Sequence, residues 1–193
     1  MLTSKEVEDA FTKMVMDRIE CGFDPHLLSF MFNPIPGSQQ AKLREMHHEA
    51  ERAYAKILTR AFRRPHSVPD LMCLPFWLVC PDWPVPKKQK QKRDDVTIND
   101  GMHLHAIALM PPDTRMQESL SDHIRDNHLH YWGADKPVRR LHADPMTKTP
   151  AKAVGYAMKS LKRRRMDETD ILILPRANDE MSRLSRAERL EDE

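Results

Sequence analysis

Glycine is scarce in this chain, with only five among 193 residues. The sequence contains neither the GxGxxG pattern nor the GxxxxGK[ST] pattern, in which glycine-rich loops let backbone amides approach a phosphate group. A dinucleotide-binding site and a P-loop NTPase site are therefore not expected. A helicase module is not expected either, because it would need a second domain and this length suits one.

Cysteine is also rare, and the three that occur are Cys21, Cys73 and Cys80. The number is odd and no CxxC pair is present, so we expect reduced thiols in a cytoplasmic protein and no zinc site. No stretch approaches the roughly 18 consecutive apolar residues of a membrane span. The opening residues, MLTSKEVEDAF, lack the apolar region of a signal peptide. We therefore expect a protein that is neither secreted nor inserted in a membrane.

Net charge is small, since 31 Lys and Arg against 29 Asp and Glu leave +2. The charge is unevenly placed: two basic clusters occupy 87–93 (KKQKQKR) and 159–165 (KSLKRRR), and the tail 178–193 has six acidic and three basic residues, a net −3. Basic residues gathered on one surface are typical of proteins that contact nucleic-acid phosphates, although a charge run can also be a solvated face. The candidate contacts are Lys87, Lys88, Arg93, Lys162, Arg163 and Arg164.

Hydrophobic periodicity predicts helices alternating with strands. The helices are expected over 3–20, 38–62, 113–128 with a Thr114 cap, and 151–165 after Pro150. The strands are expected over 27–32, 71–80, within 96–110, 138–144 and 171–174. Pro75 suggests an edge or a bulge in the second strand. This order indicates an α+β fold, a central antiparallel sheet of about five strands flanked by helices. We expect one domain over 1–177, with a mobile basic insertion over 84–100 and the charged tail behind it.

The most informative local pattern is a pair of histidines, His103 and His105, on the predicted third strand. Side chains alternate between the two faces of a strand, so both imidazoles emerge on the same side, about 7 Å apart at their roots. Leu104, Ala106 and Ala108 point to the other side, toward a core covered by helices. Two imidazoles on one rigid strand suit a divalent metal ion, but they also suit a solvated sheet face.

Tyr156 is the second chemical candidate, with Lys159 one turn later on a basic helix. A phenol is a poor nucleophile near neutral pH unless a metal or a cation stabilises the phenolate. With such help it suits attack on a phosphodiester; otherwise Tyr156 is a packing residue. Tyr54 lies on the apolar stripe of its helix and is expected in the core, whereas Tyr131, beside Trp132, is expected to anchor a loop or stack on a base. The remaining histidines, His47, His48, His123, His128 and His130, are expected to be mostly exposed.

These patterns together resemble a known superfamily. HLHAIALMPP (103–112) on a strand, followed by RRLHADP (139–145) and GYAMKSLK (155–162), resembles the HUH endonucleases, and LLSFMFNPIPG (27–37) is similar to their first motif. The superfamily includes rolling-circle replication initiators, relaxases and single-tyrosine transposases. The resemblance spans about 27–165, in the order of the superfamily, and favours the replication initiators of plasmids or phages.

The resemblance implies a metal-dependent enzyme that nicks and rejoins single-stranded DNA. Tyr156 would be the nucleophile that forms a 5′-phosphotyrosine link, with Lys159 as an electrostatic helper. His103 and His105 would hold Mn²⁺ or Mg²⁺, and imidazole ligands favour Mn²⁺ somewhat. A third ligand is expected, with Asp82 as first candidate and His142 as second.

The resemblance also implies partners and a compartment. The expected partners are single-stranded DNA or an origin hairpin, a host helicase and a polymerase, in a bacterial cytoplasm. Two other functions remain open at this point: a nucleic-acid-binding module of the same fold without catalysis, and a single-tyrosine transposase. The pattern does not determine the oligomeric state.

Overall fold

The computed structural model describes residues 3–68, 70–83 and 97–176. Its centre is a five-stranded sheet in which all pairings are antiparallel, with the strand order β4-β1-β3-β2-β5. The strands are β1 (Asp24–Phe32), β2 (Phe76–Asp82), β3 (His103–Met110), β4 (Val138–Pro145) and β5 (Leu172–Leu174). The predicted α+β class with a central antiparallel sheet is therefore confirmed.

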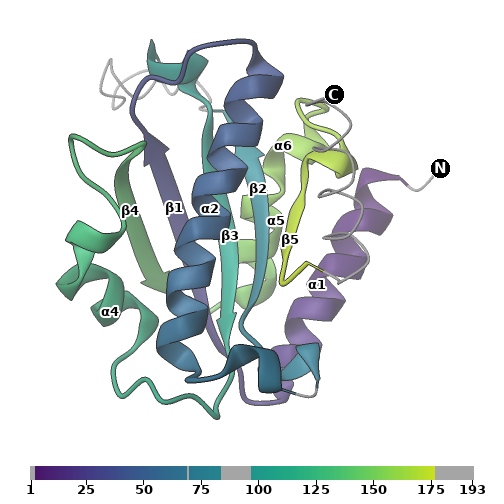
Figure 1. Ribbon diagram of the computed structural model, residues 1–193. Coiled ribbons are helices and arrows are strands. Elements are labelled where there is room, and N and C mark those ends of the chain that lie inside the picture. Colours follow the sequence, from purple (N-terminus) through teal and green to yellow (C-terminus); the bar gives the residue numbers. More distant parts are fainter. Residues whose placement is uncertain (1–2, 69, 84–96, 177–193) are drawn as a thin grey trace, which may run out of the picture.

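Helices cover both faces of this sheet (Figure 1). The helices are α1 (Ser4–Glu20), α2 (Gln39–Ala61), α4 (Leu120–Asp126), α5 (Pro150–Ala157) and α6 (Lys159–Lys162). Short 3-10 turns connect them at η1 (Pro65–Ser67), η2 (Leu71–Cys73), η3 (Ile98–Gly101), η4 (His128–His130) and η5 (Glu168–Asp170). No helix in the described ranges is long and apolar enough to cross a membrane.

The two long helices begin where their sequences supply caps. Thr3 and Glu6 form a reciprocal capping box at the start of α1, so two of the amides that the helix itself cannot satisfy have partners. The Ser38 side chain accepts from the Ala41 amide at the start of α2. From there an apolar stripe of α2, which includes Met46 and Ile57, is fully buried against the sheet.

Each sheet face has its own apolar core. On the α2 side, Leu28, Trp77 and Leu104 are completely buried, and α4 completes this core at the β4 edge. On the opposite side, Leu78 and Ile107 pack against α1, α5 and α6. Because successive strand residues alternate between faces, the second core lies on the same face as the odd-numbered positions of β3. The histidine pair belongs to that face.

Three expected elements differ from the structure. The helix predicted over 113–128 is limited to α4, because its cap is not Thr114 but Ser119, whose hydroxyl accepts from the Asp122 amide. The helix predicted over 151–165 is divided at Met158, a fully buried residue with non-helical backbone angles between α5 and α6.

The strand predicted over 71–80 was also wrong in its position, since β2 runs over Phe76–Asp82. Pro75 precedes β2 and marks no sheet edge, because β2 lies between β3 and β5. The Pro75 carbonyl instead accepts a hydrogen bond from the buried Tyr54 hydroxyl at 2.8 Å. Most of the basic insertion, 84–96, and the tail 178–193 lie outside the described residues.

Candidate metal centre

The two histidines of β3 lie on one face of the sheet, as their spacing predicts. The side chains of His103 and His105 are 12% and 6% exposed, and their Nε2 atoms are 3.3 Å apart. Leu104 and Ala106 point to the other face and are buried in the α2 core. One face of β3 therefore directs two imidazole nitrogens to one point, and the residues on its other face hold the strand in the core.

Asp82 joins this pair through the register of the sheet. The β2–β3 pairing sets Asp82 directly opposite His103, and antiparallel partners have side chains on the same face. The fully buried Asp82 carboxylate places Oδ2 3.2 Å from His103 Nε2 and 3.6 Å from His105 Nε2. Ligand atoms of the three residues all lie within 4.8 Å of one another. Asp82, His103 and His105 are called the three-ligand group below.

His142, the other candidate for the third ligand, lies elsewhere. It is on the edge strand β4, its side chain is 65% exposed, and its Nε2 pairs with Asp144 at 2.9 Å. Among the described residues, only Asp82, His103 and His105 form a cluster with metal-ligand spacing. Of the two candidates, Asp82 and not His142 therefore lies with the histidine pair.

Neighbouring groups orient both imidazoles. His103 Nδ1 lies 3.0 Å from the Gly101 carbonyl oxygen, which only accepts, so Nδ1 carries the proton. His105 Nδ1 lies 3.1 Å from the Ser29 hydroxyl of β1. These outer contacts leave each Nε2 directed at the partner imidazole and at Asp82, which is the arrangement that metal-binding histidines adopt.

Asp82 also receives two groups from α6. Its Oδ2 lies 2.6 Å from the Lys159 ammonium, and its Oδ1 accepts a 2.6 Å hydrogen bond from the Ser160 hydroxyl. Burial alone would raise the pKa of the Asp82 carboxyl, but contacts with His103, Lys159 and Ser160 outweigh it and hold the pKa well below its usual range. Asp82 is therefore an anion inside the protein.

His105 is held neutral. Burial, reinforced by the adjacent His103 and Lys159, lowers the pKa of His105 to about 3, against the opposing effect of Asp82. A neutral imidazole keeps its lone pair available, and that is the form that binds metals.

Tyr156 stands next to this group at the C-terminal end of α5. The residue is 48% exposed, the centroid of its ring lies 5.0 Å from that of His105, and the Lys159 ammonium is 3.9 Å from the same ring centroid. The predicted one-turn spacing on a continuous helix was wrong, because Met158 divides the helix between the two residues. The break still leaves both side chains at the three-ligand group, with Lys159 between the phenol and Asp82.

The donor set is suited to a divalent cation. Two imidazole nitrogens and one carboxylate oxygen are a common mixed ligand set for first-row divalent metals. Asp82 Oδ2 is buried and faces both imidazole Nε2 atoms, and the Lys159 ammonium is the cation that pairs with it in this structure. The carboxylate oxygen and the two converging imidazole nitrogens therefore surround a position at which they would stabilise a cation. The group could hold a metal ion.

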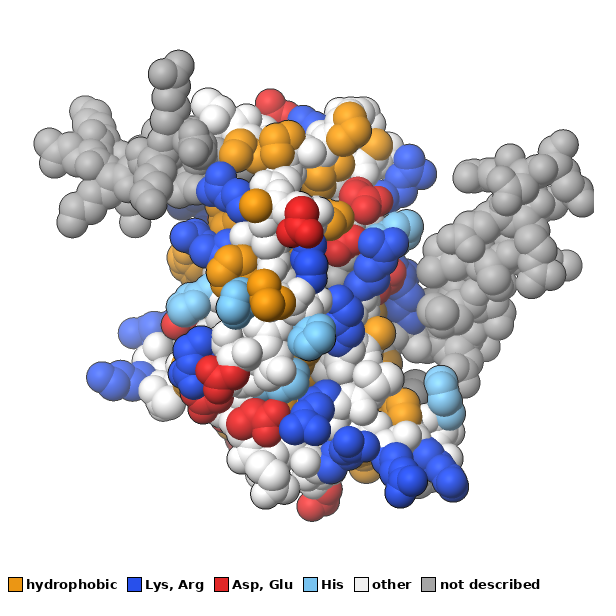
Figure 2. Space-filling model, turned by 60° about the vertical axis from the view of Figure 1, so that its left-hand side comes forward, with side chains coloured by type: hydrophobic (Ala, Val, Ile, Leu, Met, Phe, Trp, Pro, Cys, Tyr) orange, Lys and Arg blue, Asp and Glu red, His pale blue; other side chains and the backbone are white. Residues whose placement is uncertain are grey.

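Lys162, Arg163 and Arg164, the basic candidates that the structure describes, form no hydrogen bond or ion pair with this group. Lys162 is occupied by an ion pair with Glu8 of α1 at 2.8 Å. Arg163 and Arg164 are exposed just after α6. Lys87, Lys88 and Arg93 lie outside the described residues. On the side formed by β4 and α4, Lys, Arg and His side chains alternate with acidic ones (Figure 2).

The sequence reasoning missed the two serines that support the group. Ser29 is the one polar side chain in the otherwise apolar run LLSFMF of β1, and a polar residue inside a buried strand needs a partner. That signal was available. Ser160 gave no comparable signal, because a serine within a basic helix is ordinary. The expectation of mostly exposed histidines was also wrong: His48 and His130 are exposed, but His47 and His128 are half-buried and His123 is buried against Tyr131.

No family model, no curated protein and no solved structure matches this chain. The geometry of the three-ligand group and its neighbours is therefore the basis for a functional proposal.

Proposed function

We propose that this protein is a metal-dependent endonuclease and strand transferase that nicks single-stranded DNA through Tyr156. The observation that carries the proposal is the convergence of an accessible phenol, an ammonium and the three-ligand group at the end of β3. A phenol needs both a cation and a polarised electrophile to react, and this site supplies a place for each. The resemblance to HUH replication initiators supports the same reaction.

Tyr156 suits the role of nucleophile because it is reachable. Tyr54, by contrast, is 5% exposed and donates its hydroxyl proton to the Pro75 carbonyl, and Tyr131 is 7% exposed and hydrogen-bonded to His123. Only Tyr156 among the three tyrosines has nearly half of its surface open to a substrate strand.

Lys159 suits the role of an electrostatic helper. Its ammonium lies over the Tyr156 ring and in contact with Asp82. Negative charge that develops on the phenol oxygen during attack is stabilised by a nearby fixed cation. The same lysine thus connects the nucleophile to the ligand that would face the metal.

Mn²⁺ or Mg²⁺ bound by Asp82, His103 and His105 would polarise the scissile phosphate and neutralise its charge. Imidazole ligands favour Mn²⁺ over Mg²⁺, so we expect higher affinity for Mn²⁺. Ser29 and Gly101 hold the imidazoles in the ligating orientation, and Ser160 holds the carboxylate.

The reaction is a transesterification. The Tyr156 oxygen forms a bond to phosphorus while the bond from phosphorus to the 3′ oxygen breaks. The phenol proton is lost to solvent, and the leaving 3′ oxygen takes up one proton. The products are a 5′-phosphotyrosine link and a free 3′-hydroxyl, and attack by that or another 3′-hydroxyl restores the tyrosine. No water and no redox partner is consumed.

The test is a denaturing-gel assay on 5′- and 3′-labelled single-stranded oligonucleotides from the region upstream of the gene, with Mn²⁺, Mg²⁺ or EDTA. Wild type should form a metal-dependent protein–DNA adduct on the 3′-labelled strand. Tyr156→Phe should form none while it still binds Mn²⁺, because phenylalanine keeps the ring against His105 and lacks only the oxygen. Tyr54→Phe is the matched control and should retain the adduct, because the Tyr54 hydroxyl bonds to the Pro75 carbonyl on the other side of the sheet.

If Tyr156→Phe still forms the adduct, the assignment of Tyr156 as the nucleophile is refuted. Metal-dependent cleavage without any adduct would indicate that water, not tyrosine, attacks. DNA binding that is indifferent to EDTA, together with no Mn²⁺ binding in a direct titration, would favour the non-catalytic module instead.

A further inference from the structure

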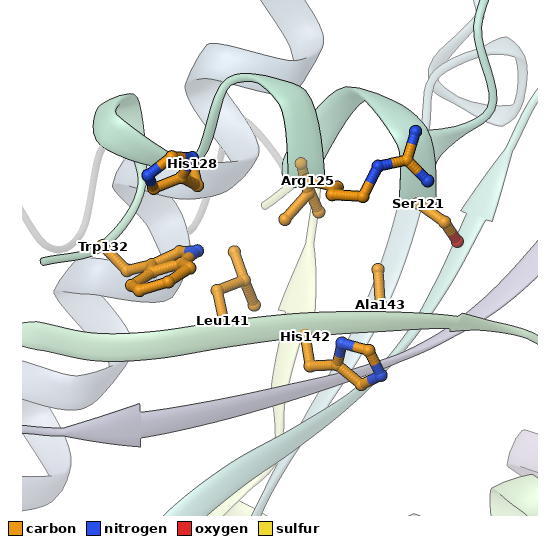
Figure 3. Close-up of a pocket in the computed structure, with 8 residues that line it drawn as sticks. Ser121, Arg125, His128, Trp132, Leu141, His142 and Ala143 are labelled. Carbon is orange, nitrogen blue, oxygen red and sulfur yellow. The ribbon is translucent and has the colours of Figure 1, made fainter.

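A pocket lies between α4 and β4, on the α2 side of the sheet (Figure 3). Its volume is about 390 Å³, within the range of small-molecule sites and larger than one nucleobase. The residues that line it include Ser121, Arg125, His128, Trp132, Leu141 and Ala143. Neither Tyr156 nor the three-ligand group lines it, so it is a separate feature of the molecule.

One wall of the pocket is aromatic. The rings of His128 and Trp132 stand together at one end, with centroids 5.1 Å apart and planes 41° apart, and both residues are half-buried. Leu141 and Ala143 form a buried apolar floor. Flat rings above an apolar floor favour a flat, apolar-faced ligand.

The other end of the pocket is polar but carries little net charge. Arg125 is already paired with Asp122 at 2.7 Å and with Asp126 at 2.9 Å. An anionic ligand such as a phosphate would meet these carboxylates, so the chemistry favours a neutral group. The Ser121 hydroxyl oxygen is buried and has no hydrogen-bond partner among the described residues. It is available to a ligand that carries donors or acceptors on its edge.

The aromatic wall is built rigidly. Glu118 contacts His123 Nδ1 at 2.8 Å, and His123 Nε2 in turn contacts the Tyr131 hydroxyl at 2.9 Å in the interior. Tyr131 is the immediate neighbour of Trp132, whose backbone amide donates to the His128 carbonyl at 3.0 Å. A binding surface that is already ordered loses little conformational entropy when a ligand arrives.

The pocket lies at the β4 edge, and the three-ligand group lies on the opposite face of the sheet, on the inner strands β3 and β2. His142 of β4 is the register partner of Ser29, and Ser29 contacts His105. Its side chain points away from Leu141 and Ala143, toward the other face (Figure 3). Two strand spacings, about 10 Å, separate β4 from β3. A polymer that passes around the β4 edge can therefore reach both places.

We propose that this pocket binds a nucleobase of the substrate strand a few nucleotides from the scissile phosphate. A nucleobase is planar, neutral and polar at its edge, and it matches the aromatic wall, the apolar floor and the free Ser121 hydroxyl together. This inference rests on the proposed function and adds a site at which the protein binds one base of the strand. Base stacking on aromatic side chains is a general mode of single-strand binding.

The test measures binding of labelled oligo(dT), oligo(dA) and oligo(dC), each of about 12 nucleotides, by fluorescence anisotropy in EDTA, where cleavage is silent. Trp132→Ala should weaken binding of at least one strand about tenfold, since that is the contribution of one stacked base. Trp132→Phe should recover most of the affinity. Leu129→Ala is the matched control, because Leu129 is 71% exposed, lies between the two rings in sequence and does not line the pocket.

A second measurement locates the base. An oligonucleotide with one 5-iodouracil should cross-link under ultraviolet light to a peptide that contains Trp132 or His128, as identified by mass spectrometry. Unchanged affinity of Trp132→Ala for all three strands, or cross-links only at other peptides, would overturn the inference. Binding of free deoxynucleoside monophosphates without any binding of strands would also overturn it.

These outcomes are separate from failure of the proposed function. Trp132→Ala should bind Mn²⁺ like wild type, because the pocket and the three-ligand group share no residue. Wild type could show neither Mn²⁺ binding nor a tyrosine adduct while its binding of strands still depends on Trp132. That result would refute the proposed nickase and support the base pocket.

Discussion

Replacing Lys159 by methionine should tighten the binding of Mn²⁺ to the three-ligand group. The Lys159 ammonium lies 2.6 Å from Asp82 Oδ2, the oxygen that faces both imidazoles. A divalent cation at this oxygen has to displace that contact or share it with a like charge. Methionine keeps an unbranched, largely apolar side chain of similar length and removes the charge.

The expected gain follows from the geometry of this pair. Two unit charges 2.6 Å apart attract by about 6 kcal/mol at an effective dielectric constant of 20. Much of this attraction is offset by the cost of dehydration, and removing one partner from a buried pair typically costs about 3–5 kcal/mol. The Lys159 side chain is 21% exposed, so its ammonium regains some hydration when displaced. We therefore expect about 1.5 to 3 kcal/mol, or about tenfold to hundredfold in the Kd for Mn²⁺.

The assay is isothermal titration of EDTA-stripped protein with Mn²⁺, together with thermal unfolding. Without metal, Lys159→Met should unfold at a lower temperature than wild type, because Asp82 loses its main counter-charge. Saturating Mn²⁺ should raise the unfolding temperature more in the variant than in wild type, since stabilisation grows with the ratio of ligand to Kd.

Lys162→Met is the matched control for Lys159→Met. It removes a neighbouring ammonium that pairs with Glu8 and does not touch Asp82. If Lys159→Met binds Mn²⁺ no more tightly than wild type while the control is unchanged, the ammonium does not compete for the carboxylate, and the reasoning is wrong.

Two further perturbations probe the support of the site and the stability of the fold. Ser29→Ala removes the hydroxyl that orients His105 and should weaken Mn²⁺ binding about tenfold or more in a competition titration with a fluorescent chelator. Unaltered affinity would mean that packing alone orients the ring. The second perturbation concerns pH. Burial lowers the pKa of His47 from 6.5 to about 4, so between these values the unfolded chain binds the extra proton and stability falls as the pH falls. From about pH 7 to about pH 5, urea unfolding of wild type should lose about 2 kcal/mol more than that of His47→Gln. If both proteins lose the same amount of stability over this pH range, His47 is not the source of the pH dependence.

Local patterns predicted a large part of the fold. The apolar stripe of 38–62 predicts α2 to within a residue at each end, because helical periodicity and the Ser38 cap are properties of neighbouring residues. The common face of His103 and His105 follows from strand alternation in the same way. The expected α4 was too long, since both Thr114 and Ser119 can cap a helix, and tertiary contacts selected the second: the Arg115 amide instead donates to the Ala61 carbonyl at the end of α2.

The sequence by itself determined the class of the fold, the histidine pair and the identity of the tyrosine and lysine beside it. Strand geometry converts the two-residue spacing of the histidines directly into a shared face, whereas the association of Tyr156 and Lys159 with that pair came from the resemblance to the HUH endonucleases. Only the tertiary structure decided that Asp82 and not His142 completes the group, that Ser29 and Ser160 support it, and that Lys159 stands between Asp82 and Tyr156. Those relations join residues 20 to about 80 positions apart, and they depend on strand register and helix packing, which the burial of two apolar cores sets for the chain as a whole.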